Sequence, residues 1–188
     1  MKVQFHRTGE RRYAIVVLRE GQEPLRMDSA PGYDSLMPHD LQHLIVEQEL
    51  GIRLGIFGQI AAGGTAGTFH HLHNGTDRAP TRVVRRSRKK GKTLQQAGLE
   101  DAMFSERATY ICWHHWLSAI SDPRADDMAD TARSLLALSP EHERKRYTPD
   151  LLQRVSSKMN VLSKKWSSTP VGEYLEIEWT ASGSKSTA

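Results

Sequence analysis

The sequence predicts an α+β domain in which a small, mostly antiparallel sheet packs with four to five helices. Segments with strand character lie near the two ends of the chain, whereas helical periodicity fills the middle. The length of 188 residues and an apolar share of 38% suit one globular domain over residues 1–181. The small and polar residues at 182–188 indicate a disordered tail.

The first expected elements are strands. Val3 and Phe5 alternate with polar residues, and residues 13–18 form a short apolar run rich in β-branched side chains, so a hairpin is favoured. A short third strand follows Pro24, because proline is tolerated at a strand start or a sheet edge. Near the other end, residues 174–179 alternate between apolar and polar and predict a strand that closes the same sheet.

Helix signals fill the region between these strands. Pro38 at a first helical position and Gly51 just beyond a last turn bound one expected helix. A capping box at Thr93 begins another helix, and residues 125–138 form the next. Thr148, followed by proline and aspartate, caps the last helix.

The helix at residues 38–51 carries the strongest chemical pattern. His39, His43 and Glu47 fall on one face at successive spacings of four residues, opposite an apolar face. Imidazoles one turn apart can bind a single divalent ion, and a carboxylate completes the set. We therefore expect zinc or iron on His39 and His43, with Asp40 or Glu47 as the carboxylate or general base. In the alternative interpretation, Asp40 only stabilises the helix start and the histidines are merely hydrogen-bonded.

The sequence does not match the zincin motif on this helix or the phosphate-binding loop motif further along the chain. The zincin motif HExxH requires glutamate where this chain has Asp40. The pair His39-Asp40 resembles the His-Asp pair of the HD phosphohydrolases, but a match of only two residues does not assign their function to this chain. Gly91-Lys92-Thr93 ends like a phosphate-binding loop, whereas Arg86 stands where that loop requires its first glycine.

Positive charge is concentrated in one segment. Residues 77–92 have a formal charge of +7, against −3 for the rest of the chain. Because like charges repel in a compact fold and attract polyanions, we expect a long, flexible basic loop at about residues 63–92. Its candidate anion-binding or nucleic-acid-binding residues are Arg78, Arg82, Arg85, Arg86, Arg88, Lys89, Lys90 and Lys92. A solvated loop without a partner is the alternative.

A second histidine group precedes the basic residues. His70, His71 and His73 lie in a glycine-rich stretch, where a mobile arm would bring a further ligand over the histidine helix. A histidine cluster without any ligand is the alternative. The lone cysteine, Cys112, has no second cysteine with which to form a disulfide or a zinc site within the chain.

Three functional hypotheses follow from these patterns. The first is a metal-binding, hydrolase-like protein that acts on an anionic substrate through the histidine helix. The second is a nucleic-acid-binding module that acts through residues 78–92, and the third is a non-catalytic partner-binding domain. The single cysteine and the lack of a secretory leader favour the cytoplasm, and no apolar run is long enough to predict a membrane partner.

Overall fold

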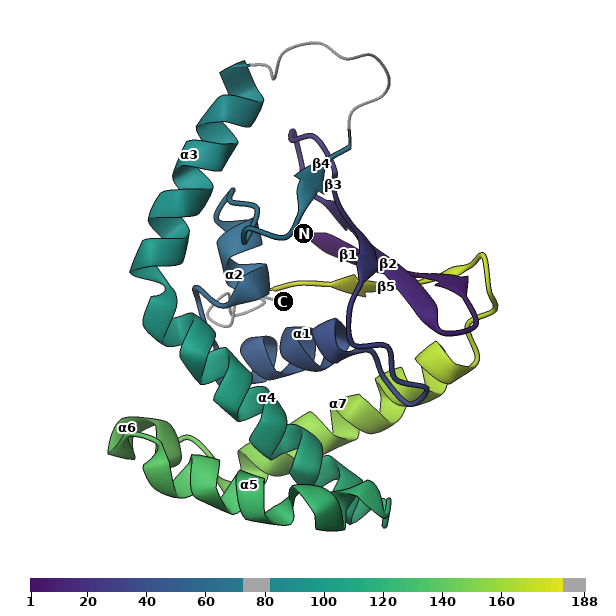
Figure 1. Ribbon diagram of the computed structural model, residues 1–188, viewed down its shortest axis with the longest axis vertical. Helices are drawn as coiled ribbons and strands as arrows, with labels where there is room; N and C mark the ends of the chain where they lie inside the picture. Colours follow the sequence, from purple (N-terminus) through teal and green to yellow (C-terminus); the bar gives the residue numbers. More distant parts are fainter. Residues whose placement is uncertain (73–81, 181–188) are drawn as a thin grey trace, which may run out of the picture.

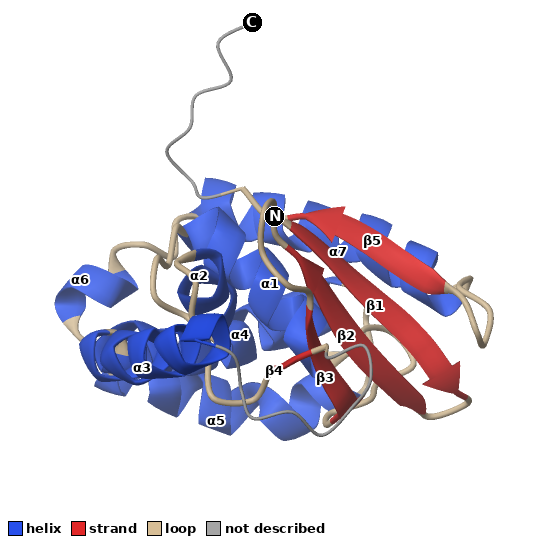
Figure 2. Ribbon diagram, turned by 90° about the horizontal axis from the view of Figure 1, so that it is seen from above, coloured by secondary structure: helices blue, strands red, loops and turns tan. Residues whose placement is uncertain are grey.

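The computed structural model describes residues 1–72 and 82–180, in which a sheet lies on one side and the helices on the other (Figures 1 and 2). The predicted α+β class is confirmed. The strands are β1 (Lys2–Gly9), β2 (Arg12–Leu18), β3 (Leu25–Ala30), β4 (His70–His71) and β5 (Tyr174–Glu178). They are ordered β4-β3-β2-β1-β5, and every neighbouring pair is antiparallel.

One edge of the sheet brings together strands that are far apart in the sequence, β1 and β5. β1 and β2 form the predicted hairpin, with Val3 opposite Val17. On the other side of β1, the C-terminal strand β5 places Leu175 opposite Phe5. These four side chains are buried in the core that the helices cover, as the alternating pattern predicts.

The helices are α1 (His39–Leu50), α2 (Ile56–Ala61), α3 (Arg82–Ala97), α4 (Leu99–Ala119), α5 (Arg124–Leu138), α6 (Glu141–Arg144) and α7 (Pro149–Ser167). Two predicted helix ends are confirmed. Gly51 follows α1 in the left-handed conformation, with φ of 60°, which glycine adopts at little cost. The Thr148 hydroxyl accepts a hydrogen bond from the Leu151 amide at 3.2 Å and caps α7.

Helix α1 lies at the centre of the helical side and packs against α2, α4 and α7 (Figure 1). Nearly all of its residues are buried, and these include Asp40, His43 and Glu47. Buried polar groups are stable only when other groups satisfy them. The burial of α1 therefore requires a defined partner for each of its polar side chains.

Part of the segment that was expected to be a loop is regular structure. Residues 63–92 contain the strand β4 and the first part of helix α3. Most of the basic residues of this segment lie in α3. Thr93, expected to begin a helix, lies inside α3, and α4 begins after Gly98. The described helices include none with the length and apolarity needed to cross a bilayer. The expectation of disorder at 182–188 concerns residues outside the described ranges.

Candidate metal centre

Three ligand groups meet where α1 packs against α4. His39 and His43 stand one turn apart on α1, and Glu106 of α4 offers a carboxylate to both. One ligand atom from each residue lies within 4.8 Å of the other two. In a tetrahedral zinc site with bonds of about 2.1 Å, ligand atoms are about 3.4 Å apart. Because His39 and Glu106 are exposed, small side-chain rotations can bring all three groups to one ion.

His43 is the buried member of this cluster, and its inner ring nitrogen is hydrogen-bonded. Nδ1 lies 2.8 Å from Oγ of Ser105, which donates its own proton to Oε1 of Glu47 over 2.9 Å. A serine hydroxyl has a single proton, so while Ser105 donates to the ionised carboxylate of Glu47 it accepts from His43, which assigns the ring proton to Nδ1. The outer nitrogen, Nε2, is then unprotonated and has a free lone pair.

This lone pair has no hydrogen-bond donor. Among the described residues, Nε2 of His43 has no hydrogen-bond partner although it is buried, and Oε2 of Glu106 lies 3.4 Å away. Two lone pairs at this distance repel each other unless a proton or a metal cation lies between them. The ring of His39, whose centroid is 4.6 Å from that of His43, bounds the same space. A metal ion would satisfy the nitrogen and the carboxylate together.

The electrostatic surroundings favour the forms of these groups that bind metals. Desolvation lowers the pKa of His39 and keeps its imidazole neutral. A hydrogen bond from His43 in its protonated form lowers the pKa of Glu106 below its ordinary value, against the effect of desolvation. A neutral imidazole and an ionised carboxylate are the states that ligate divalent ions.

Glu47, a candidate ligand and general base from the sequence, holds helix α2. Its Oε1 accepts a hydrogen bond from the Ile56 amide at 2.7 Å, and its Oε2 accepts one from the Phe57 amide at 3.0 Å. These amides are free at the start of α2, so the carboxylate caps that helix. Burial raises the pKa of Glu47 to about 7, although these hydrogen bonds oppose the shift. Its oxygens lie outside the converging ligand atoms.

A glycine makes this capping contact possible. A Cβ atom at Gly55 would lie only 2.2 Å from Oε1 of Glu47. Any side chain at this position would therefore displace the carboxylate. The glycine thereby helps to hold Glu47 and, through Ser105, the ring of His43.

Asp40, the other candidate carboxylate, contacts the sheet. It is buried and accepts a hydrogen bond from the hydroxyl of Tyr13 on β2. Burial raises the pKa of Asp40, while this hydrogen bond opposes the rise. Its oxygens also lie outside the converging group, so the contact fastens the first turn of α1 to the sheet.

A hollow of about 380 Å³ opens beside the cluster, and His39 and Glu106 form part of its wall. The rest of the lining consists of Gly32, Tyr33, Asp34, Gln42, Thr109, Tyr110, Trp113 and Met128. Asp34 is paired with Arg124 at 2.5 Å, which offsets its charge. A hollow of this size holds a small molecule.

Sequence patterns do not single out Glu106, Ser105 or Thr109, all of which lie on α4. Ser105 and Thr109 are buried one turn apart among apolar side chains, and this is the signal that could have drawn attention to them. Oγ1 of Thr109 lies 3.2 Å from Nδ1 of His43. The place of Glu106 beside the histidines follows only from the packing of α4 against α1.

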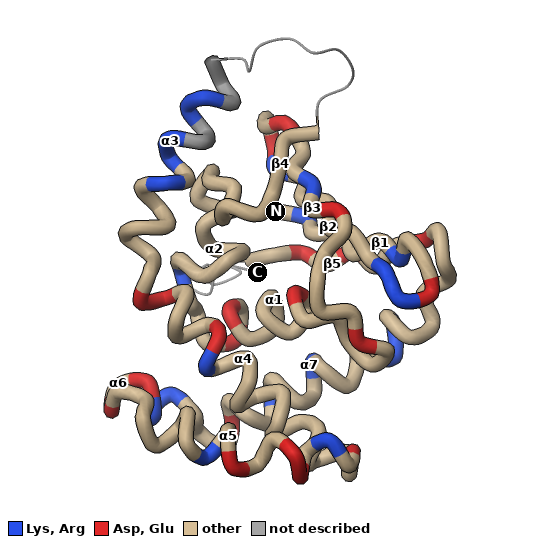
Figure 3. Tube along the Cα trace, viewed as in Figure 1, with Lys and Arg blue, Asp and Glu red and all other residues tan. Residues whose placement is uncertain are grey.

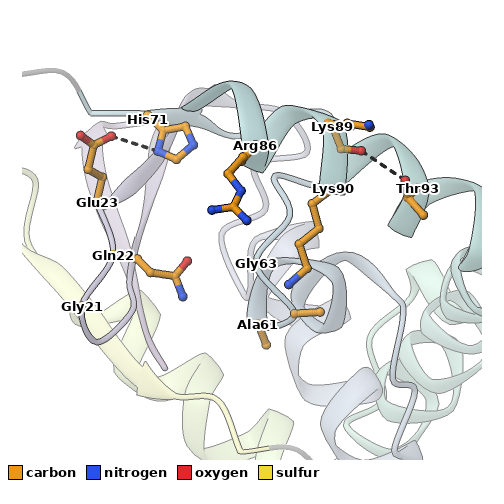
Figure 4. A pocket seen from close by; sticks show the side chains of 11 residues that line it. Gly21, Gln22, Glu23, Ala61, Gly63, His71, Arg86, Lys89, Lys90 and Thr93 are labelled. Carbon is orange, nitrogen blue, oxygen red and sulfur yellow. Dashed lines mark hydrogen bonds and ion pairs between the residues drawn. The ribbon is translucent and has the colours of Figure 1, made fainter. Parts of the chain in front are cut away.

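The predicted basic residues lie in a different part of the molecule. Lys and Arg are crowded along the upper part of α3 (Figure 3). Arg86, Lys89 and Lys90 line a second hollow, of about 950 Å³ (Figure 4). In the described part of the chain, this hollow shares no lining residue with the one beside His39. The basic helix therefore does not form a wall of the candidate metal centre.

The other basic candidates are placed as follows. Arg85 and Lys92 are exposed on α3, outside both hollows. Arg82 and Arg88 belong to α3, but their side chains are not among the described parts of the structure. Arg78 lies outside the described residues altogether.

Two members of the second histidine group lie at the edge of the sheet. His70 and His71 form β4, which pairs with β3. Nδ1 of His71 lies 3.3 Å from the carboxylate of Glu23, and His71 lines the hollow under α3. His73 is outside the described residues. The two described histidines therefore belong to a different hollow from the one that His39 lines.

Comparison of the chain with protein-family models, with curated proteins and with solved structures finds no match. Its own residues are therefore the grounds for a functional assignment. Among the described residues, the group formed by His39, His43 and Glu106 is the one whose ligand atoms converge.

Proposed function

We propose that this protein is a metal-dependent hydrolase whose divalent ion is held by His39, His43 and Glu106. One observation carries the proposal: the buried Nε2 of His43 has no hydrogen-bond partner among the described residues and lies 3.4 Å from Oε2 of Glu106. Its tautomer is set by Ser105 and Glu47 on the opposite side of the ring. Three protein ligands leave coordination positions for water and substrate, as in catalytic zinc sites.

The hydrolytic chemistry follows from this ligand set. A bound divalent ion lowers the pKa of its water to about 7 and polarises a substrate oxygen. With two neutral imidazoles and one carboxylate, the centre has a net charge of about +1, which favours an anionic substrate. The adjacent hollow of about 380 Å³ supplies space for a small one.

Zinc and iron both remain candidates for the ion. Two histidines with one carboxylate bind zinc in hydrolases and Fe(II) in oxygenases. A hydrolase is proposed because the hydrolytic step needs only water as a second reactant. Glu47 serves here as a positioning residue through Ser105, whereas Asp40 only fastens the first turn of α1 to Tyr13 of the sheet.

Metal content tests the ligand assignment. Protein without a histidine tag is incubated with zinc or with Fe(II), freed of excess ion and analysed for metal. We expect about one ion per chain in the wild type and in the control His115→Ala, whose exposed side chain lies outside the cluster. His43→Ala and Glu106→Gln should retain less than about 0.2 ions per chain. A wild type below that level would overturn the metal site.

Turnover tests the reaction class. The metal-loaded protein is assayed with chromogenic phosphate monoesters, phosphate diesters and anionic carboxylic esters. We expect hydrolysis of at least one class, its loss with a chelator and its loss in Glu106→Gln. A metal-loaded wild type that hydrolyses none of them would overturn the proposed hydrolase.

A further inference from the structure

We propose that the hollow beneath α3 binds the phosphate group of a small phosphorylated ligand, independently of the metal centre. The hollow has a volume of about 950 Å³ and lies between α3, the end of α2 and the turn that joins β2 to β3. Four residues of α3 line it, together with Gln22, Glu23, Gly63 and His71 from the other elements. This volume lies in the range of about 300–1,000 Å³ that is typical of small-molecule sites.

One face of α3 supplies the positive charge. The face consists of Arg86, Lys89, Lys90 and Thr93, and each of them lies three or four residues from two of the others. Figure 4 shows that the side chains of Arg86 and Lys90 point from α3 into the hollow and that Gln22 lies on its opposite side. An arginine fork and a lysine ammonium are both common ligands of phosphate oxygens.

The charges in the hollow match a phosphate monoester. Glu23 is the one acid among the lining residues that the structure describes, and its carboxylate lies 3.3 Å from Nδ1 of His71. The lining cations Arg86, Lys89 and Lys90, together with this carboxylate, give a formal charge of about +2. A phosphate monoester has a charge of about −1.5 to −2 at neutral pH. The partners are therefore close to neutral when combined.

The fold holds this face of α3 close to the glycine loop after α2. A Cβ atom at Gly64 would lie 3.3 Å from Cα of Gly91, so the helix and the loop touch through two glycines. At Gly63, with φ of +93°, a Cβ atom would lie 3.2 Å from Nζ of Lys90. The position of the Lys90 ammonium over the loop depends on these small residues.

A buried arginine is hydrogen-bonded to the glycine loop after α2. Arg19, which directly follows β2, donates from Nη1 to the carbonyl oxygens of Ile60 at 3.0 Å and Gly64 at 3.3 Å. It is only 8% exposed, so both bonds are shielded from water. The loop opposite the basic face is thus tied to the sheet, which gives the hollow a defined floor.

The lining favours a small phosphate over a nucleic acid chain. Among the described residues that line it there is no Phe, Tyr or Trp, so they offer no platform on which bases stack. A protein that binds a nucleic acid strand has a row of cations in a groove along the phosphate backbone. Arg86 and Lys90 instead point into one hollow. The structure therefore favours recognition of one phosphate group.

Calorimetry on the full chain tests the site, with inorganic phosphate and pyrophosphate as probes and a chelator present to exclude binding through metal. The test variant is Arg86→Gln with Lys90→Gln. The matched control is Arg85→Gln with Lys92→Gln, which removes the same charge from exposed positions of the same helix. We expect the test variant to weaken binding at least about tenfold and the control to change it less than about twofold.

Four results would overturn this inference. The first is that neither probe binds the wild type at millimolar concentration. The second is that the test and control variants lose affinity equally, because the effect is then one of general charge. The third is that only a single-stranded DNA of about 20 nucleotides binds, which would assign the basic face to nucleic acid. The variant His43→Ala should bind the probes as the wild type does, and its failure to do so would place them at the metal centre instead.

Discussion

His43 and Glu47, one turn apart on α1, are linked through the hydroxyl of Ser105 on α4, which accepts from Nδ1 and donates to Oε1. The same carboxylate caps the start of α2 through backbone amides. A histidine ligand whose second nitrogen is held by a hydrogen bond is typical of metal sites in proteins. Three helices therefore fix the orientation of one imidazole ring.

Removal of the linking hydroxyl should weaken metal binding. In Ser105→Ala, Nδ1 of His43 and Oε1 of Glu47 lose a shared partner, and we expect the zinc affinity to fall about 10- to 100-fold. Competition with a chromophoric chelator measures this change. Ser118→Ala is the control, because that exposed hydroxyl bonds only a carbonyl of its own helix. Equal affinities in the two variants would contradict the linkage.

Glu47 should make stability depend on pH in a definite direction. Its ordinary pKa is 4.5, and burial raises it to about 7 in the folded chain. Between these values the folded chain keeps a proton that the unfolded chain has released, so the free energy of unfolding falls as the pH rises. Glu47→Gln lacks this titration. Urea unfolding between pH 4.5 and about 7 should show that the wild type loses stability relative to the variant as the pH rises. Free energies of unfolding that change with pH in parallel for the two proteins would refute the prediction.

The contact between Tyr13 and Asp40 should stabilise the fold without serving the metal. Tyr13→Phe removes the donor to a buried carboxylate, and we expect a loss of about 1–3 kcal/mol in the free energy of unfolding. Tyr174→Phe, on the exposed surface of β5, should cost less than about 0.5 kcal/mol. Zinc affinity should remain unchanged in Tyr13→Phe, since Asp40 lies outside the cluster. A tenfold loss of affinity would show that Asp40 acts on the centre.

Cys112 should be inert in the native protein. It is fully buried on α4, and burial raises the pKa of its thiol to about 12. Because the thiolate is the reactive form, we expect a thiol reagent at mildly alkaline pH to label Cys112 only as the chain unfolds. Mass spectrometry across a urea titration follows this labelling. Complete modification without denaturant would show that the helix opens locally.

Local signals predicted the elements that depend on neighbouring residues. The end of α1 at Gly51 and the cap of α7 at Thr148 rest on backbone geometry within a few residues, and both are confirmed. The alternation of Val3 and Phe5 likewise indicated a strand with one buried face. In each case the physical cause lies inside the element itself.

The parts that were not predicted depend on contacts between distant segments. The start of α3 carries no apolar stripe, and the helix instead approaches the loop after α2 through Gly91 and Gly64. The carboxylate beside the histidines comes from Glu106, because α4 packs against α1 there. Spacing alone placed Glu47 on the histidine face, whereas the nearby amides of α2 engage its oxygens.

The pairing of β1 with β5 governs when this protein can finish folding. β1 has β2 on one side, available as soon as the hairpin is made, and β5 on the other, which ends at Glu178. During synthesis on the ribosome, the outer backbone groups of β1 therefore stay open until β5, more than 160 residues later, has emerged. An open strand of this kind pairs readily with other chains. Truncation before Tyr174 should for the same reason yield material that associates edge to edge.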